Sequence, residues 1–461
     1  MTRRVEWIVL GCILAVYLVI AGQYAARTPD WQAPDEPAHY NYVRQIADEG
    51  RLPVLKMGDW NQDYQTALTG SKFSPDLTEC RNPGEIACPG LEAIEYEDHQ
   101  PPLYYLLQAP VYALTDGDLG ALRLWSVVMG AGVVFTTWAV LWVLFPDVPG
   151  LALTGAAFVA FIPQHLSILG SVSNDALAEL VVGLTLLAVV VYLGNWRITG
   201  PDGDETVRRI SPVVLGLLAG VALLTKSTIY FLGGIVVLAV LLRWWRESWD
   251  RQRAARHLAA VLIPALLLGG GWWGRNLNVY GGLDFLGLQR HDEVTVGQMR
   301  RTEYIDMYGR QQYLESYAKT TFHSFWGQFG WMAVVLPTRV YRLFLLFTLG
   351  VLVGTGLFVW RKRWPTTLSP PQQHMLLVLA AALLLTFAAY LLYNRDFVQF
   401  QGRYLYPALL PMGLLVAVGL CGWTTVVEDR FPALVWLPVL AMMGLAVFAW
   451  YALDTYLVPN L

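Results

Sequence analysis

The sequence predicts an all-α, polytopic membrane protein that forms a single domain over residues 1–461, with about eleven transmembrane helices. The first reason is composition, because 55% of the residues are hydrophobic and 15% are charged. The second is that apolar runs of roughly 20 residues, long enough to cross a bilayer, recur along the whole chain. The net charge of −3 does not indicate a nucleic-acid partner. Membrane lipids are therefore the expected surroundings.

The apolar runs predict the spans in order. They cover residues 6–26, 121–145, 150–170, 176–194, 212–225, 229–245, 258–273, 337–360, 374–393, 404–422 and 432–452. The first run is too long for a signal peptide and ends without a small-residue cleavage site, so we expect a retained helix. Two long segments, 27–120 and 274–336, separate the spans into groups.

Residues 213–245 form an almost unbroken apolar run that only "TKST" (225–228) interrupts. A single helix of this length would measure about 50 Å, whereas the hydrocarbon core of a bilayer is about 30 Å thick. We therefore expect a hairpin of two short helices with Lys226 at its turn. This lysine either reaches to the lipid headgroups with no further role or binds a lipid phosphate.

Basic residues in the short loops predict the orientation of the chain. One side carries Arg3, Arg4, Arg197, Arg208, Arg209, Arg243, Arg246, Arg251, Arg253, Arg256, Arg361, Lys362, Arg363 and Arg430, and the other carries Lys226, Arg395 and Arg403. The first side is expected to be cytoplasmic. The protein is then a multi-pass protein of the cell (plasma) membrane with a cytoplasmic N terminus. The C terminus and the loops 27–120 and 274–336 are extracytoplasmic.

Cysteine usage agrees with an oxidising compartment for the first outer loop. Cys80 and Cys88 flank a Pro-Gly turn and are spaced for a small disulfide, although two free thiols would also fit the sequence. Cys12 and Cys421 are single residues within spans, where cysteine usually serves packing.

The stretch "DEPAHYNYVRQIADEG" (35–50) predicts a helix in this loop. Asp35 or Glu36 suits its N-terminal cap, Pro37 its first turn and Gly50 its end. The apolar face around Tyr40 predicts an amphipathic helix along the membrane surface. A second, tyrosine-rich helix is expected after "HQPP" (99–102). Acids at a helix N terminus also stabilise the helix dipole without any further role.

Further polar side chains stand at the outer ends of the spans. They are Asp98 and His99 before the Pro-Pro pair, Asp175 in "SVSND", Arg275 and Asn276 in "GWWGRN", and Arg395, Asp396 and Arg403 in "YNRDFVQFQGR". Each alone could be a helix cap or a headgroup contact. Their common side predicts an extracytoplasmic site.

These residues resemble a known group of enzymes. An acidic "DE" pair in the first outer loop, flanked by surface helices, is similar to the GT-C superfamily of polyprenyl-phosphate-dependent glycosyltransferases. "PPLYYLL", "LLTKS" and "RNLNVYG" resemble the branch of protein mannosyltransferases and aminoarabinose transferases. "SFWGQFGW" (324–331) and "QGRYLYP" (401–407) resemble a bacterial family of membrane proteins with that architecture.

The resemblance implies a transfer of a sugar from a polyprenyl-phosphate donor to an envelope glycan, lipid or protein acceptor, with inversion. It implies that Asp35 is the general base, which takes the proton of the attacking hydroxyl. The cations expected at the lipid phosphate are Lys226, Arg275 and Arg403. The residues expected to bind substrate are Glu36, Tyr40, Asp98, His99 and Asp175.

The chain departs from this branch at one position that matters. Aminoarabinose transferases have Glu-Lys before the Pro-Pro pair, whereas this chain has His99-Gln100, so the phosphate role of that lysine is missing. No compact metal motif or nucleotide-binding glycine motif is present, and no cofactor is expected with certainty. A divalent metal held by His99, Asp98 and Glu36 is the less favoured alternative.

The second outer loop, 274–336, is charged at first and then aromatic, and it is either a mobile cover over a lipid site or an ordinary loop packed on the first outer loop. Two other functions fit the same residues: a transporter or flippase for lipid-linked sugars, and a noncatalytic assembly subunit with the GT-C fold. A water-accessible Asp35 beside a phosphate pocket would favour the enzyme. An Asp35 locked in a buried ion pair would favour the noncatalytic subunit.

Overall fold

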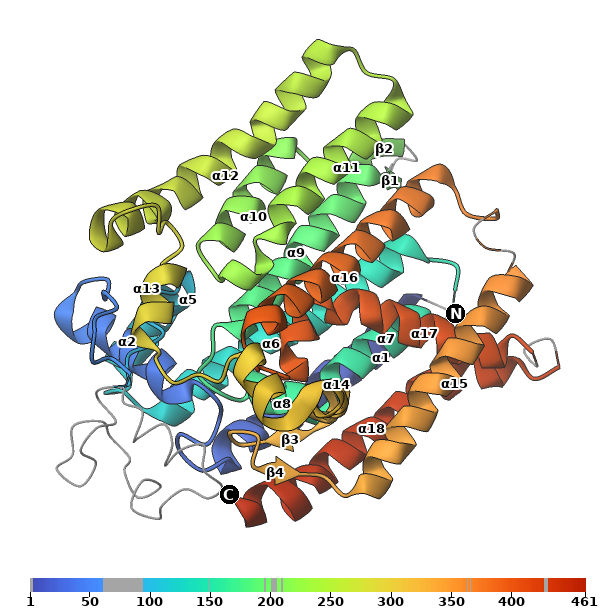
Figure 1. The fold of residues 1–461 in the computed structure, drawn as a ribbon. Helices are drawn as coiled ribbons and strands as arrows, with labels where there is room; N and C mark the ends of the chain where they lie inside the picture. Colours follow the sequence, from blue (N-terminus) through green and yellow to red (C-terminus); the bar gives the residue numbers. More distant parts are fainter. Residues whose placement is uncertain are drawn as a thin grey trace.

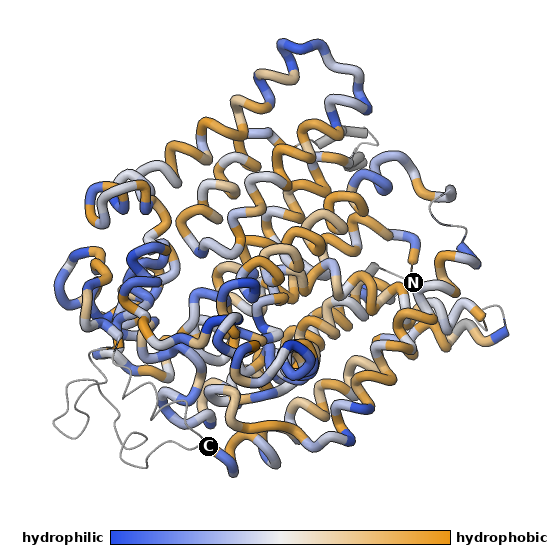
Figure 2. Tube along the Cα trace, viewed as in Figure 1, coloured by the Kyte–Doolittle hydropathy of each residue, from blue (hydrophilic) through white to orange (hydrophobic). Residues whose placement is uncertain are grey.

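The computed structural model describes residues 3–60, 94–148, 150–194, 196–199, 205–208, 210–362, 364, 366–426 and 430–461. Helices dominate the described residues, and they form one bundle (Figure 1). The expected Cys80–Cys88 disulfide lies outside the described residues. The apolar segments run through the middle of the bundle, and polar segments lie at both ends (Figure 2).

Nine helical stretches among the described residues are long and apolar enough to cross a membrane, and a bent helix pair makes a tenth. The helices of the bundle are α1 Arg3–Arg27, α6 Leu119–Leu144, α7 Leu151–Phe161, α8 Pro163–Leu169, α9 Asp175–Leu193, α10 Pro212–Leu223, α11 Phe231–Glu247, α12 Arg251–Tyr280, α15 Thr338–Lys362, α16 Pro370–Asp396, α17 Leu409–Thr424 and α18 Leu437–Ala452. Each of the eleven predicted spans falls on one of these segments, the shorter α10 included. The all-α membrane fold is therefore confirmed.

The predicted hairpin within residues 213–245 is present. α10 ends at Leu223, the short 3₁₀ turn η2 (Ser227–Ile229) follows, and α11 begins at Phe231. Tyr230 closes the turn, because its hydroxyl donates a hydrogen bond to the Leu223 carbonyl at 2.7 Å. Lys226 therefore lies where the chain reverses direction.

The predicted span 150–170 is broken rather than straight. α7 and α8 meet at Ile162 with a bend of 67°. Pro163 accounts for the break, since proline has no N–H for the helical ladder and its ring disfavours a helical conformation in the residue before it. Every residue of both helices is buried.

The segments predicted to be extracytoplasmic gather on one side of the bundle, together with the C terminus (Figure 1). They are α2 Glu36–Glu49, α5 Leu103–Leu114, α13 Leu288–Val294, α14 Arg301–Trp326, and the antiparallel strands β3 Gln328–Phe329 and β4 Val334–Val335. A second antiparallel pair, β1 Trp196–Thr199 and β2 Glu205–Arg208, lies elsewhere on the bundle (Figure 1).

The helix α2 begins and ends as its sequence predicts, but its environment differs. Gly50 caps it in the left-handed conformation with φ 66°. Tyr40, Tyr42 and Val43 are buried, and the Tyr42 ring stacks on Tyr105 of α5 at 3.7 Å between centroids. The tyrosine face that was expected to contact the membrane surface is therefore packed against protein. α2 and α5 bury their tyrosine faces against each other and the bundle.

Candidate functional site

A cavity of about 220 Å³ opens among segments that are far apart in the sequence. The loop before α2, the segment before α5, α13 and its connection to α14, the β3–β4 hairpin and the α16–α17 connection all contribute to it. It is lined by Pro34, Asp35, Trp60, Tyr96, Glu97, His291, Gln298, Trp331, Met332, Tyr393, Gln399, Gln401, Arg403 and Tyr404.

Asp35 and Arg403 form an ion pair in the wall of this cavity. One oxygen of Asp35 binds Arg403 Nη2, and the other accepts a hydrogen bond from the Tyr96 hydroxyl at 2.6 Å. Arg403 Nε donates to Gln401 Oε1 at 2.7 Å. The Asp35 side chain keeps 23% of its surface exposed and that of Arg403 keeps 6%. Asp35 is thus paired and still in contact with the cavity.

The backbone of Asp35 holds its carboxylate toward the cavity. Asp35 occupies the N-cap position of α2 with φ 66°, and its side chain makes no capping hydrogen bond. Neither does Glu36 cap the helix, because its carboxylate binds Arg123. Met332, also in the cavity wall, has φ 71°. Left-handed backbone at non-glycine residues is energetically costly and concentrates at functional sites.

The ion pair sets the protonation state of Asp35. Burial by itself raises the pKa of this carboxyl, but the charge of Arg403 and the hydrogen bond from Tyr96 outweigh it and hold the pKa at about 2. Asp35 is therefore ionised at neutral pH. It is also a weak base for as long as Arg403 stays bound to it.

Arg403 is placed by the 3₁₀ segment η3 (Gly402–Ala408) and its close approach to α14. A Cβ on Gly402 would lie 2.4 Å from the Phe325 nitrogen and 2.4 Å from the Thr321 carbonyl oxygen. The Gly402 N–H donates to Ser324 Oγ at 2.7 Å. Gly402 of the "QGRYLYP" motif therefore allows η3 to pack closely against α14. This packing places the next residue, Arg403, beside Asp35.

Two acceptors in the cavity wall have no donor. Glu97 Oε2 and Gln298 Oε1 are buried and have no hydrogen-bond partner among the described residues. Burial raises the pKa of Glu97, and the charges of His39 and Lys226 oppose this rise. Since buried acceptors are normally paired, the cavity suits a ligand that donates hydrogen bonds.

Asp175 and Lys226 form a second ion pair close to the first. Asp175 is the first residue of α9, and its Oδ1 lies 2.5 Å from Lys226 Nζ in the hairpin turn. The charge of Asp175 acts on Arg403, and that of Lys226 acts on Glu97. The structure thus brings together four of the residues predicted for the site.

Two predicted substrate-binding residues are instead part of the packed core. Glu36 is fully buried, and its carboxylate binds Arg123 through two contacts of 2.8 and 2.6 Å. Tyr40 is 2% exposed, and its hydroxyl donates to the Gly117 carbonyl at 2.7 Å. Neither residue lines the cavity.

Asp98, His99 and Arg275 lie near the cavity without lining it. Asp98 accepts two hydrogen bonds from Gln45 Nε2, at 3.0 and 3.2 Å. The His99 ring lies 4.4 Å from that of His291, which does line the cavity, and burial lowers the pKa of His99 to about 4. Arg275 donates to the Pro53 carbonyl and stacks over Trp272.

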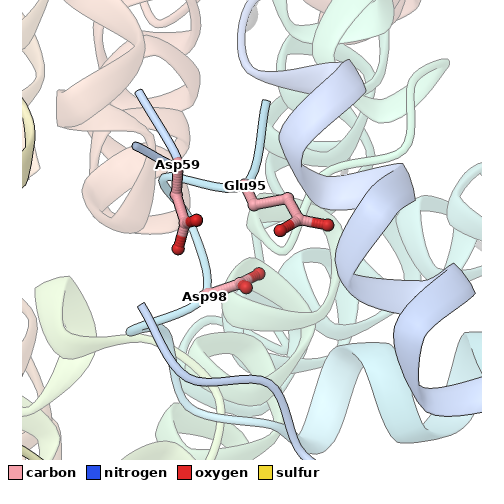
Figure 3. A group of neighbouring side chains, drawn as sticks. All are labelled: Asp59, Glu95 and Asp98. Carbon is pink, nitrogen blue, oxygen red and sulfur yellow. The ribbon is translucent and has the colours of Figure 1, made fainter. Parts of the chain in front are cut away.

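A cluster of three carboxylates, Asp59, Glu95 and Asp98, lies beside this region (Figure 3). Their ligand atoms lie within 4.8 Å of one another, and burial is the largest cause that raises the pKa of each. Such a set fits a hard divalent cation, which prefers oxygen ligands. Of the expected metal-binding residues His99, Asp98 and Glu36, only Asp98 belongs to this cluster.

Sequence reasoning missed several residues of the cavity wall, including Tyr96, Glu97, His291 and Gln298. Tyr96 and Glu97 stand directly before Asp98 in "EYEDHQ", and they line the cavity whereas Asp98 does not. His291 and Gln298 lie in the second outer loop, where no sequence pattern distinguishes them.

Solved structures with the same fold include ArnT and an archaeal oligosaccharyltransferase. A crystal structure of ArnT from Cupriavidus metallidurans bound to undecaprenyl phosphate matches with a TM-score of 0.50 and 15% identity, over 99% of this chain and 74% of that chain. Oligosaccharyltransferase from Archaeoglobus fulgidus in complex with Zn and sulfate matches with 0.52 and 14%, over 96% and 52%. The same enzyme tethered with an acceptor peptide matches with 0.51 and 13%, over 98% and 55%. The expected GT-C fold is confirmed.

The chain spans about half the length of the archaeal enzyme. A family model described as "Predicted membrane protein (DUF2142)" matches residues 18–412. No curated protein sequence matches the chain.

Proposed function

This chain belongs to the DUF2142 family of membrane proteins, and we propose that it is a glycosyltransferase that moves a sugar from a polyprenyl-phosphate donor to an acceptor on the extracytoplasmic face. One observation carries the proposal. On a GT-C fold, a partly exposed carboxylate, Asp35, lines a cavity that also holds an arginine and two acceptors without donors. The likeness to ArnT bound to undecaprenyl phosphate supports a donor whose sugar is carried on a lipid phosphate.

The proposed reaction is a single displacement at the anomeric carbon of the donor. The acceptor oxygen forms a bond to this carbon, the bond from the carbon to the phosphate oxygen breaks, and polyprenyl phosphate leaves with the electron pair. The proton of the attacking hydroxyl passes to Asp35. One displacement inverts the anomeric configuration.

In the structure Arg403 is bound to the Asp35 carboxylate, which must act as base. Donor binding therefore has to separate Arg403 from Asp35. A lipid phosphate carries negative charge and competes with Asp35 for the guanidinium, which holds phosphate oxygens bidentately. When Arg403 turns to the phosphate, the pKa of Asp35 rises from about 2 toward its ordinary value. Donor binding would thus free Asp35 to act as the base, and Arg403 would stabilise the negative charge of the leaving phosphate.

Other residues of the site have roles in this proposal. Glu97 Oε2 and Gln298 Oε1 would accept hydrogen bonds from sugar hydroxyls, because they have no other donor among the described residues. Lys226, held by Asp175, would be the second cation at the phosphate. The His99 ring would hold the His291 ring in place through the contact between the two rings. Arg275 has no role in this proposal, because it does not line the cavity.

A divalent cation at Asp59, Glu95 and Asp98 is part of this proposal as a structural aid. A bound cation would supply positive charge that holds the three carboxylates together. The check is thermal unfolding of purified protein after treatment with a chelator, with and without added Mg²⁺, Ca²⁺ or Mn²⁺. A cation that raises the unfolding temperature of native protein, and not that of Asp98→Asn, supports the site. Equal effects on both exclude it.

A noncatalytic GT-C subunit is the second candidate, and the Asp35–Arg403 ion pair favours it. The same pair would then be a permanent structural contact. The two candidates differ in whether bound donor is consumed.

The experiment that tests the proposal uses purified protein in lipid nanodiscs, a panel of polyprenyl-phosphate sugars and an envelope extract as the source of acceptor. Release of polyprenyl phosphate and loss of donor are followed together. Turnover of any donor supports the transferase. Donor binding without turnover supports the noncatalytic subunit, and movement of intact donor across the bilayer of sealed proteoliposomes, measured in parallel, supports a flippase.

A further inference from the structure

The break between α7 and α8 leaves the Val159 carbonyl without its helical donor. Pro163 has no N–H, so the Val159 carbonyl four residues earlier has no donor in the helix. The imidazole of His165 takes this place, with Nδ1 2.7 Å from the Val159 oxygen. Because a carbonyl oxygen only accepts hydrogen bonds, Nδ1 must carry a hydrogen.

The other ring nitrogen of His165 faces a carboxylate. Nε2 lies 2.7 Å from Glu179 Oε2, and the side chains are 0% and 3% exposed. Such a contact needs a hydrogen between the two atoms, in addition to the one on Nδ1. It lies either on Nε2, as imidazolium beside carboxylate, or on Oε2, as carboxylic acid beside neutral imidazole. Both forms have zero net charge, which limits the cost of burying the pair within a membrane span.

Among the described residues, no other group near the pair supplies this hydrogen. The hydroxyl of Tyr17 donates to the Val127 carbonyl, and that of Tyr406 donates to the Phe325 carbonyl. Asp175 and Lys226, which act on Glu179 from one turn away, are paired with each other. Glu179 Oε1 has no hydrogen-bond partner among the described residues. The pair therefore holds a proton of its own.

Two elements of the cavity wall, η3 and the β3–β4 hairpin, are connected to this pair, and so is α9 beside the cavity. Glu179 lies one turn after Asp175 in α9. The His165 ring packs edge-on against Tyr406 of η3 at 5.1 Å, three residues after Arg403. The neighbouring Gln164 accepts a hydrogen bond from the Gln328 N–H at 2.8 Å, at the start of the β3–β4 hairpin whose Trp331 and Met332 line the cavity.

We propose that His165 and Glu179 are positioning residues: sharing one proton, they fix the α7–α8 break and thereby the places of α9, η3 and the β3–β4 hairpin around the cavity. Neither residue touches the cavity itself. The inference rests on the proposed function only in treating the cavity as the donor site. The shared proton and the position of the hairpin can be measured without any transferase activity.

The shared proton is tested by nitrogen-15 NMR of histidine-labelled protein in lipid. His165→Asn assigns the resonance, and His374→Asn is the matched control, because His374 Nδ1 has no hydrogen-bond partner among the described residues. We expect a protonated Nδ1 and no change in the His165 signals from pH about 5 to about 8, where an ordinary histidine titrates. A His165 that titrates in this range, or that has a bare Nδ1, overturns the proposal.

The positioning role is tested by the reactivity of a cysteine placed in the hairpin, Met332→Cys, with a water-soluble maleimide. Mass spectrometry separates this site from the four natural cysteines, Cys12, Cys80, Cys88 and Cys421. His165→Phe in this background should change the labelling rate by about tenfold or more, the factor by which loss of an outer-shell partner lowers affinity or activity at metal sites. Glu179→Gln should change it by less than about threefold, since the Gln amide can donate to Nε2.

His165→Phe that folds and labels at the native rate overturns the positioning role. Glu179→Gln that labels like His165→Phe overturns the shared proton, because it would mean that the negative charge is required. If native protein proves unable to bind or consume any donor, the proposed function fails, and both measurements on the pair keep their meaning.

Discussion

The pairing of Asp35 with Arg403 determines the chemistry available to the site. A carboxylate with a pKa of about 2 is ionised but takes protons poorly, and the same guanidinium that lowers its pKa is the cation suited to a lipid phosphate. In the proposed mechanism, donor binding and release of Asp35 from Arg403 are one exchange of partners, and the site stays inactive until the donor binds.

The depressed pKa of Asp35 predicts how its contribution to stability depends on pH. Since the folded pKa of about 2 lies below the ordinary value of 3.8, the stabilising contribution is complete above the ordinary pKa and is lost as the pH falls toward 2. The difference in unfolding temperature between native protein and Asp35→Asn should be constant above pH about 5. Below it, the difference should shrink. A difference that stays constant down to the lowest pH that the native protein tolerates would contradict the ion pair.

Glu36 differs from Asp35 although the two are neighbours, because it is sealed in the core with Arg123. Removal of one partner leaves the other charge buried and unpaired, so Glu36→Ala should cost about 3–5 kcal/mol of unfolding free energy. Glu49→Ala in the same helix is the control, since the Glu49–Arg51 pair is exposed and worth at most about 1 kcal/mol. Unfolding in detergent measures both. Equal losses in the two variants would refute the structural role.

At the scale of elements, the contact of η3 with α14 carries Arg403 to Asp35. Gly402→Ala should cost about 1–3 kcal/mol of stability, because the added Cβ meets backbone atoms that cannot move aside. It should also weaken donor binding by displacing Arg403. Gly444→Ala in α18, where nothing lies within 4 Å of the added Cβ, is the matched control. Thermal unfolding and donor titration give the two readouts. Unchanged donor binding in a destabilised Gly402→Ala would show that η3 does not position the arginine.

Sequence alone could predict the elements that depend on local rules. Length and apolarity predict the spans, "TKST" predicts the hairpin turn, and Pro37 and Gly50 predict the limits of α2. The bend between α7 and α8 was missed, although Pro163 is visible, because a proline within an apolar run does not by itself say whether a span kinks or breaks. The burial of α2 was missed because an amphipathic face fits a lipid surface and a protein partner equally well.

At the scale of the whole molecule, the site joins residues that are 368 positions apart in the sequence, Asp35 and Arg403. The distribution of basic residues in the short loops could place both on one side of the membrane, and this common side made them candidate site residues. Those rules could not separate Asp35 from Glu36, whose partner Arg123 lies within a predicted span. Nor could they identify Glu97 or Gln298, because an unpaired acceptor is a property of the folded chain and not of its pattern.

The predicted orientation has its own test. Cysteines placed at Arg253 and Asn460, at opposite ends of the chain's topology, should react differently with an impermeant maleimide. Asn460→Cys should label in intact cells, and Arg253→Cys only after permeabilisation, because the C terminus and the cavity are expected to face outward. The reverse pattern would place the cavity on the cytoplasmic side, where it could not serve an extracytoplasmic acceptor.

The role of Asp35 as the base that takes the proton of the acceptor hydroxyl is tested by one comparison of variants. With a donor that the native protein consumes, release of polyprenyl phosphate is measured for native protein, Asp35→Asn and the exposed control Asp48→Asn on the same helix, together with the donor Kd of each. We expect Asp35→Asn to lose about 10²–10⁴-fold in kcat and to retain donor binding. Asp48→Asn should turn over like the native protein. Native and Asp35→Asn proteins that bind donor and release polyprenyl phosphate at the same rate would contradict it.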